Sequence, residues 1–305
     1  MRTVRFGILA SLLILIPDIG GAGFQAETYV FPVVARNAGA AGSDWRTEMC
    51  VTNHLASDPL NVGVLLIQGQ LDGAAILALQ PGETICSDDF LNDWFDRSKW
   101  QGAAVVLATE DTNPGLQSRY FTASVRVYNL TPNGTYGLSV TPEPNLSPMY
   151  DDAFDRTGNW DASGVHHFGT PGVDGSRSSM GVFNSEEFDL LFLFAVTDTF
   201  GNIVWTKTRW VNALAQYQTN LPKNLSVPDG GLRVEIIDGG PDGWQFLAFP
   251  YLTVTDNKTG DGRYIAASET WTLDAKAGSS NLGLSNSVEA LAPRDASDAV
   301  VIRTR

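Results

Sequence analysis

Short runs of alternating apolar and polar residues, bounded by Gly, Pro, Asn or Asp, recur along most of the chain. Around Cys50, for example, Met49 and Val51 share one face of an extended chain, while Glu48 and Thr52 take the other. Such runs predict β-strands. We expect strands at Tyr29–Arg36, Trp45–Asn53, Leu60–Gln68, Ala74–Leu79, Ala103–Thr109, Tyr120–Tyr128, Thr135–Val140, Val165–Gly169, Ser178–Asn184, Phe188–Thr197, Ile203–Trp210, Ala213–Thr219, Leu232–Asp238 and Phe246–Thr255, with a short one near Tyr264.

Two segments depart from simple alternation. Phe90, Leu91, Trp94 and Phe95 form a helical apolar stripe, which Ser87, Asp88 or Asp89 can cap, so we expect a short helix there. The run Leu190–Val196 is apolar on both faces. It is therefore either a central strand or a contact between two domains, and we favour the domain contact.

The pattern R-x-x-M-x-V-x-N occurs twice, 131 residues apart. A period this long, compared with the 20–50 residues of solenoids and propellers, indicates two copies of one domain. The turns Gly69–Gly73 and Asp198–Asn202 fall at corresponding places in the two copies. The matched residues are Arg46, Met49, Val51 and Asn53 in the first copy, and Arg177, Met180, Val182 and Asn184 in the second.

A second block of similar residues lies 128 residues apart. Its asparagines suit the end of a strand, its glycines suit a tight turn with positive φ, and its tyrosines begin a returning strand. We therefore interpret both blocks as structural framework and not as reactive sites. The block consists of Asn129, Gly134 and Tyr136, repeated as Asn257, Gly262 and Tyr264.

The expected fold is all-β, with two tandem antiparallel β-sandwich domains of immunoglobulin-like build. We place the first copy at residues 28–141 and the second at 164–274. A Pro-rich linker at residues 142–163 joins them. The remaining residues, 275–305, form a Gly- and Ser-rich tail that we expect to be mobile, with one possible edge strand around Val300–Ile302.

Residues 1–22 have the features of an export signal: Arg2 and Arg5, an apolar stretch too short to span a membrane, then small residues. We expect export from a bacterium, to the periplasm, cell surface or medium, and no transmembrane anchor in the mature chain. The net charge is −14, which disfavours binding to nucleic acid or anionic lipid.

The two cysteines, Cys50 and Cys86, lie in the first copy, and Gly181 stands at the position of Cys50 in the second. Export to an oxidising compartment permits a disulfide between them. In the chain-entropy model, closing this loop would stabilise the folded state by on the order of 3–4 kcal/mol. A reactive thiol is the alternative, but no nearby histidine pattern supports it.

The sequence offers little for catalysis, metals or cofactors. His166 and His167 are neighbours on an expected strand and would point to opposite faces, and the third histidine, His54, is in the other copy. The loop Asp256–Gly262 lacks the spacing of a calcium loop. No nucleophile elbow, P-loop or dinucleotide fingerprint occurs. The carboxylate pairs Asp88–Asp89 and Asp151–Asp152 leave a glycosidase open as an alternative.

Aromatic residues near turns and edges are the best candidates for a ligand surface, because they can stack on sugar rings or anchor a protein partner. The alternative is that they belong to the core or cover the ends of the sandwich. The candidates are Trp94, Trp100, Tyr150, Trp160, Trp205 and Trp210.

The segments Phe31–Arg36, Trp45–Thr47, Val51–Asn53 and Val254–Asp261, together with Gly42, resemble uncharacterised exported bacterial proteins built from tandem β-sandwich repeats. The resemblance covers both copies but not the tail, and it weakens at Val165–Gly169. It implies an architecture and no catalytic residues. We therefore expect a non-enzymatic exported module that binds an unknown protein or glycan. The alternatives are a secreted carboxylate-dependent hydrolase that acts on glycans, or a subunit of a surface filament.

Overall fold

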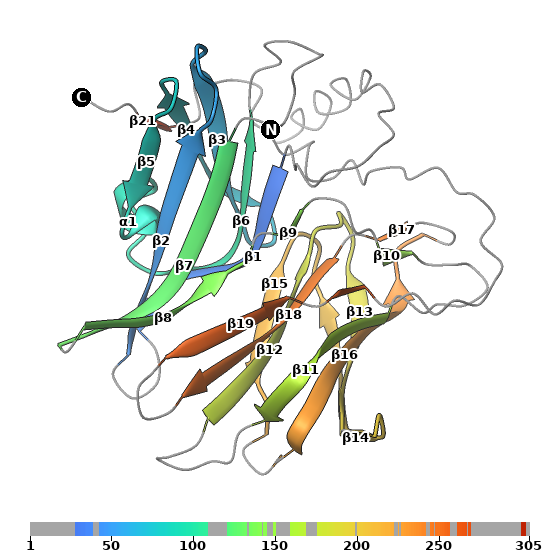
Figure 1. Cartoon of the computed structure of the whole chain (residues 1–305). Coiled ribbons are helices and arrows are strands. Elements are labelled where there is room, and N and C mark those ends of the chain that lie inside the picture. The colour runs from blue at the N-terminus through green and yellow to red at the C-terminus, as the bar shows by residue number, and fades with distance from the viewer. Residues whose placement is uncertain are drawn as a thin grey trace.

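A computed structural model describes residues 28–38, 43–108, 121–132, 134–141, 143–144, 149–150, 159–168, 176–198, 200–222, 225, 227–241, 245–246, 248–256, 261–266, 268–269 and 300–302. Over these residues the fold is nearly all β, in several antiparallel sheets, as expected. Figure 1 shows two groups of strands, one formed by β1–β9 and the other by β11–β20. We call them the N-terminal and C-terminal units.

The N-terminal unit is one sheet in the order β21-β4-β3-β6-β1-β2-β7-β8, in which β5 also pairs with β2 and β9 with β1. The sheet bends where β1 leaves β6 to pair with β2, so its two parts enclose a core that includes Phe31, Met49, Val62 and Val106. Its elements are β1 (Thr28–Ala38), β2 (Asp44–Asn53), β3 (Leu60–Ile67), β4 (Leu71–Leu79), β5 (Thr84–Ser87), α1 (Phe90–Asp93), β6 (Trp100–Ala108), β7 (Phe121–Thr131), β8 (Gly134–Val140) and β9 (Glu143–Pro144).

The C-terminal unit has two sheets, in the orders β14-β13-β16-β11-β20 and β15-β12-β18-β19, around a second core. A separate two-stranded sheet joins β10 (Met149–Tyr150) and β17 (Gln245–Phe246). The other elements of this unit are β11 (Asn159–Phe168), β12 (Ser176–Asn184), β13 (Leu190–Thr197), β14 (Ile203–Val211), β15 (Gln216–Asn220), β16 (Val227–Gly239), β18 (Ala248–Asp256), β19 (Gly262–Ala266) and β20 (Ser268–Glu269). The last strand of the chain, β21 (Val300–Ile302), belongs to the sheet of the N-terminal unit.

The two units have the same strand order. The series β4-β3-β6-β1-β9 recurs as β14-β13-β16-β11-β20, and β5-β2-β7-β8 recurs as β15-β12-β18-β19. In both units the first strand pairs with the sixth, and in the N-terminal unit its last residues also pair with the second. In an immunoglobulin domain the first strand pairs with the second and not with the sixth. The build of two facing sheets is thus kept, but not the immunoglobulin strand order.

Asn53 and Asn184 make matching hydrogen bonds at equivalent places. Both are fully buried, and each side-chain carbonyl accepts the backbone N–H two residues ahead, from Leu55 and Glu186 respectively. Each amide nitrogen donates to three backbone carbonyls of two nearby loops. Met49, Val51, Met180 and Val182 are fully buried in the two cores. These residues of the first repeated block therefore act as framework.

The second repeated block is not structurally equivalent, and this prediction is wrong. Tyr136 faces Asn129 across β8 and β7, whereas Tyr264 faces Thr253, well inside β18. Gly134 has φ of 127°, but Gly262 lies on a strand without positive φ. The connection between β18 and β19 is longer than the one between β7 and β8, so the returning strand has another register. Asn257 lies outside the described residues.

The run Leu190–Val196 is a central strand and not the domain contact that we favoured. It forms most of β13, which is flanked by β14 and β16, and its alternate residues Phe192 and Phe194 are buried in the C-terminal core. The contact between units lies elsewhere. The outer face of β1, β3 and β6 packs against Phe183, Leu214 and Phe249 of the C-terminal unit, and Tyr251 and Tyr264 pack against the N-terminal core.

Polar contacts fix the relative position of the two units. The side chain of Gln68, at the end of the β3–β4 hairpin, donates to the carbonyl of Gln216 and accepts its N–H. The N–H of Gly69 donates to the carbonyl of Leu214 at 2.7 Å. The tip of the first hairpin is therefore anchored to the loop before β15, next to the apolar contact.

The boundaries differ in detail from the expected ones. The predicted linker contains β9, β10 and the start of β11, because β11 begins at Asn159 and pairs with β16. In the tail, Val300–Ile302 forms β21, parallel to β4 at the edge of its sheet. The helix α1 starts where expected, but Asp89 caps it without a side-chain bond, since its carboxylate pairs with Arg36.

The disulfide prediction is confirmed. Cys50 on β2 and Cys86 on β5 face each other across the ladder and form a bond. The equivalent facing pair in the C-terminal unit is Gly181 and Gln218. A Cβ atom at Gly181 would collide with the ring of Tyr251, so glycine is required where that ring crosses the strand.

Candidate ligand-binding cleft

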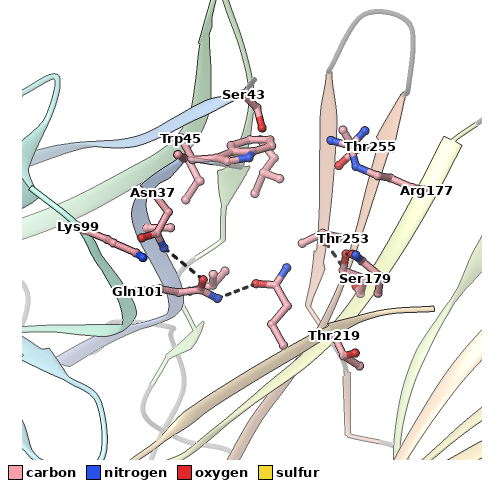
Figure 2. Close-up of a pocket in the computed structure, with 17 residues that line it drawn as sticks. Asn37, Ser43, Trp45, Lys99, Gln101, Arg177, Ser179, Thr219, Thr253 and Thr255 are labelled. Carbon is pink, nitrogen blue, oxygen red and sulfur yellow. Dashed lines mark hydrogen bonds between the residues drawn. The ribbon is translucent and has the colours of Figure 1, made fainter. Parts of the chain in front are cut away.

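A cleft of about 580 Å³ lies between the two units. Its volume is within the range typical of small-molecule sites. One wall comes from β1, β2 and β6, and the other from β12, β15 and β18 (Figure 2). The cleft forms beside the apolar contact, where the facing sheets no longer touch.

The N-terminal wall is built at the bend of β1. Here Asn37 of β1 pairs with Trp45 of β2, and both residues line the cleft at this end of the sheet. Gln101 is held in the next strand opposite Ala35, and its side chain accepts a bond from the Asn37 amide at 3.4 Å. Lys99 stands at the rim just before β6.

The C-terminal wall is a regular ladder of short polar side chains. Arg177 and Ser179 of β12 lie opposite Thr255 and Thr253 of β18, on the outer face of that sheet. The Ser179 hydroxyl donates to Asn220 at 2.6 Å. Because residues two apart point the same way on a strand, alternation brings all of these side chains to one face.

Neutral amides close the floor between the two walls. The Gln101 amide donates to the side-chain oxygens of both Gln216 and Gln218, each at 3.2 Å. Gln216 also donates to the hydroxyl of Tyr251, which is fully buried. Burial raises the pKa of the Tyr251 phenol, although the Gln216 hydrogen bond lowers it in part. The floor is therefore uncharged at neutral pH.

The chemistry of the cleft is hydrogen bonding, ring contact and weak positive charge. Its described lining includes amides, hydroxyls, the indole of Trp45 and two cations, but no carboxylate, histidine or cysteine. Such a lining can donate to and accept from a polar ligand, while it supplies no acid–base pair. Over the described part of the chain, no group of three metal-binding side chains occurs.

None of the four predicted aromatic surface residues whose side chains are described lines the cleft. Trp94 and Trp100 are buried in the N-terminal core, so they are not ligand platforms. Trp205 is half-buried against the C-terminal core, and Trp210 is exposed on β14. The side chains of Tyr150 and Trp160 lie outside the described residues. Sequence reasoning missed the tryptophan that does line the cleft, Trp45, although it precedes the repeated Arg46.

Other sequence candidates have ordinary structural roles where they are described. The exposed His54 bonds to the hydroxyl of Thr122 at 2.9 Å. Asp89 is buried and pairs with Arg36 at 2.8 Å and Arg46 at 3.5 Å, so it is a structural charge. Most of the loop 256–262, the pair Asp151–Asp152 and the side chains of His166 and His167 lie outside the described residues.

The equivalent arginines have different surroundings. Arg46 is on the free outer face of β2 and pairs with Asp44 and Asp89. The hydrogen bond with Asp44 raises the pKa of Arg46 further. Arg177 occupies the same position of the repeated strand but lines the cleft. Both units thus have an arginine at this position, but only in the C-terminal unit does the sheet face that carries it line the cleft.

No protein-family model and no curated protein matches this chain. Among solved structures, a lectin from Pleurotus ostreatus is 15% identical, over 84% of this chain and 81% of the lectin, with a TM-score of 0.15. A β-glucuronidase 2 mutant from Bacteroides uniformis is 11% identical over 79% of this chain and 28% of the enzyme, with a TM-score of 0.17. A vicilin from Capsicum annuum is 9% identical over 79% of this chain and 75% of the vicilin, with a TM-score of 0.17. These scores carry no argument about fold or function.

Proposed function

We propose that this protein is an exported, non-catalytic binding module whose cleft between the two units holds a saccharide. The observation that carries the proposal is the lining of the cleft. Amides and hydroxyls face it from both walls, and the indole of Trp45 lies at one side (Figure 2). Hydroxyl-rich ligands need both donors and acceptors, and aromatic rings contribute apolar contact area with a fixed geometry.

We further infer that the chain consists of two tandem β-sandwiches that arose by duplication of one. The identical strand orders and the matching hydrogen bonds of Asn53 and Asn184 support this. The proposed family, exported bacterial proteins of tandem β-sandwich repeats, is consistent with such a duplication. In this view the ligand site is a product of the pair, because each unit supplies one wall.

The disulfide supports export. Cys50–Cys86 is intact on the outer face of β2 and β5, and disulfides persist mainly in oxidising compartments. In the described part of the chain, no helix has both the length and the apolar character needed to cross a membrane.

The observations give less support to a carboxylate-dependent hydrolase. Glycosidases place two carboxyl groups roughly 5–10 Å apart around the scissile bond. The described lining of the cleft contains no carboxylate, so this cleft does not present the pair. A hydrolase would need its site in another part of the molecule.

A filament built by repeating the contact between units is also less well supported. That contact needs an apolar outer face on each partner. In the C-terminal unit, Arg233 and Glu235 occupy the strand positions equivalent to Val105 and Leu107. In the N-terminal unit, Thr52 and Thr122 occupy the strand positions equivalent to Phe183 and Phe249. Both free ends are therefore polar, which stops the stack at two units.

The test is saccharide binding at the cleft, measured by calorimetry on the full mature chain with a panel of neutral and acidic oligosaccharides. We expect binding that Trp45→Ala weakens at least tenfold and that Trp45→Phe weakens less, because phenylalanine keeps a ring. Trp210→Ala is the matched control, since Trp210 is exposed on β14, away from the cleft. If no saccharide binds, or if Trp210→Ala weakens binding as much as Trp45→Ala, the proposal is wrong.

A further inference from the structure

Exposed apolar side chains gather on the hairpin of β13 and β14. Of the five large apolar side chains that are exposed among the described residues, four belong to this hairpin. They are Phe200 (88% exposed), Ile203 (57%), Val204 (46%) and Trp210 (46%). Grouped apolar exposure of this kind marks contact sites on soluble proteins. We call the strand and the turn before it, residues 200–211, the β14 surface.

The equivalent strand and turn of the N-terminal unit are both covered. β4 holds the place of β14 in the shared strand order, and β21 pairs along it in parallel through Val300–Ile302. The turn before β4 is anchored to the C-terminal unit through Gln68 and Gly69. No residue of β4 is exposed, whereas six of the nine in β14 are. Among the described residues β14 pairs only with β13, so its outer edge keeps unpaired backbone groups (Figure 1).

We infer that the β14 surface binds an extended segment of a partner protein as an added strand, as β4 binds β21. The residues of β21 are all β-branched, which shows the kind of segment that this position in the fold accepts. In strand addition, backbone hydrogen bonds supply affinity and alternate side chains supply specificity. The surface is separate from the cleft, because none of its residues lines the cleft.

Two cations of β14 indicate the charge of the partner segment. Lys207 and Arg209 lie over the ring of Tyr217 in the facing sheet, at 5.7 and 5.4 Å from its centroid. They therefore share the inner face of β14, and among the described residues neither pairs with a carboxylate. Acidic residues two positions apart on an added strand would lie on this face beside them. A second copy of β14 would instead bring like charges together, so self-pairing is disfavoured.

The outer face of β14 indicates the alternate positions of the partner segment. Trp210 of β14 faces Leu191 of β13, so the two side chains share this face of the sheet. Leu191 and Leu193 are half-buried there. Aliphatic side chains of an added strand would extend this apolar surface. The expected partner segment therefore alternates aliphatic and acidic residues.

The turn of the hairpin is ordered without a partner. The Asp198 carboxylate accepts the backbone N–H groups of Phe200 and Asn202 at 2.9 and 2.8 Å, and the Asn202 amide at 3.0 Å. Phe200 is thus presented from a fixed turn at the start of β14. A preformed edge of this kind binds a strand without the entropy cost of ordering the site.

The experiment uses three heptapeptides that alternate valine with glutamate, glutamine or lysine, measured by fluorescence anisotropy with the full mature chain. We expect the glutamate peptide to bind about 2- to 30-fold more tightly than the glutamine peptide at low salt, from two exposed ion pairs, and the lysine peptide to bind most weakly. The difference should vanish at high salt, because salt screens exposed charges. Hydrogen exchange followed by NMR should show new protection of the β14 amides that β13 does not bond.

Variants then assign the preference to the two cations. Lys207→Gln and Arg209→Gln should each weaken the glutamate peptide about 1.4- to 5-fold and leave the glutamine peptide unchanged. Arg126→Gln is the matched control, because Arg126 also lies over a tyrosine ring but stands on the interior strand β7 and pairs with Glu48.

Several results would overturn the inference. They are no binding by any peptide, equal binding of the glutamate and lysine peptides, or protection of a strand other than β14. Protection of the whole β14 edge in the free protein would also overturn it. If dilution removes that protection, a second copy covers the edge, and if dilution has no effect, the chain itself covers it. Saccharide binding at the cleft is independent of all these outcomes, so the proposed function is tested separately.

Discussion

Replacing Asn53 or Asn184 by alanine should destabilise the protein strongly and to a similar extent. Each side chain is fully buried and joins two loops to the end of a strand. Alanine fits the strand but removes every side-chain hydrogen bond. Backbone groups that bond to these side chains, such as the carbonyls of Asp58 and Phe188, stay close to the gap.

The magnitude can be worked out from the bonds of 3.1 Å or less. Asn53 makes three, with Asp58, Gln80 and Leu55, at 3.0, 3.1 and 2.8 Å. Asn184 also makes three, at 2.9, 3.1 and 3.1 Å. At about 1 kcal/mol net per bond, each substitution should cost about 3 kcal/mol, and more where a buried group finds no water. That is a large part of the roughly 5–15 kcal/mol of a typical domain.

The assay is denaturant unfolding of the oxidised protein, followed by tryptophan fluorescence and circular dichroism. Asn53→Asp separates the roles of the two ends of the amide, because aspartate keeps the acceptor for Leu55 and loses the donors. Asn220→Ala is the control, since Asn220 is exposed and contacts Ser179, and it should cost less than 1 kcal/mol. A loss below 1 kcal/mol at both buried sites, or a large loss at only one, would refute the structural equivalence of the two asparagines.

Three further predictions concern single features of the fold. Gly181→Ala should cost about 1–3 kcal/mol in denaturant unfolding, because the new methyl group collides with Tyr251; Ser179→Ala on the same strand should cost less, and equal values would contradict the argument. Replacing both Cys50 and Cys86 by serine should cost about 3–4 kcal/mol, measured without reductant, and an unchanged unfolding midpoint would show that the bond is not stabilising. The hydrogen bond from the Asn202 side chain is the main cause that lowers the pKa of Asp198. The ionised Asp198 carboxylate therefore stabilises the hairpin fully above its unfolded-state pKa, and this stabilisation is lost as pH falls through its folded-state pKa. An NMR titration should place the Asp198 midpoint below that of free aspartate and Asn202→Ala should raise it; an ordinary midpoint in the parent protein would contradict this.

The sequence was a good guide where local chemistry decides the structure. Alternation around Met49 and Val51 identified a half-buried strand, and two cysteines in a chain with an export signal predicted the bond that joins β2 and β5. The second repeated block failed because its residues report turn chemistry, which many loops share, and not the register of the strands. Leu190–Val196 was misjudged because an apolar run does not show whether a neighbouring sheet or a neighbouring domain covers it.

The cleft could not be predicted from sequence because it belongs to neither unit alone. Trp45 looks like any inward-facing strand residue, and it reaches the cleft only because β1 bends beside it. Lys99 is one of many exposed cations until the opposite wall is in place. Nothing in a strand pattern states which outer face of a sheet another unit will cover.

The divergence of equivalent positions on one sheet face explains why the site exists once. On the N-terminal unit this face stayed outside, and the pair Cys50–Cys86 crosses it. On the C-terminal unit the equivalent pair is Gly181 and Gln218, which make room for Tyr251 and supply the floor of the cleft. Glycine is needed at position 181 because a Cβ atom there would collide with the ring of Tyr251. The residues that distinguish this face from its equivalent thus form both the contact between units and a wall of the cleft, and a single unit would lack the cleft even if it folded.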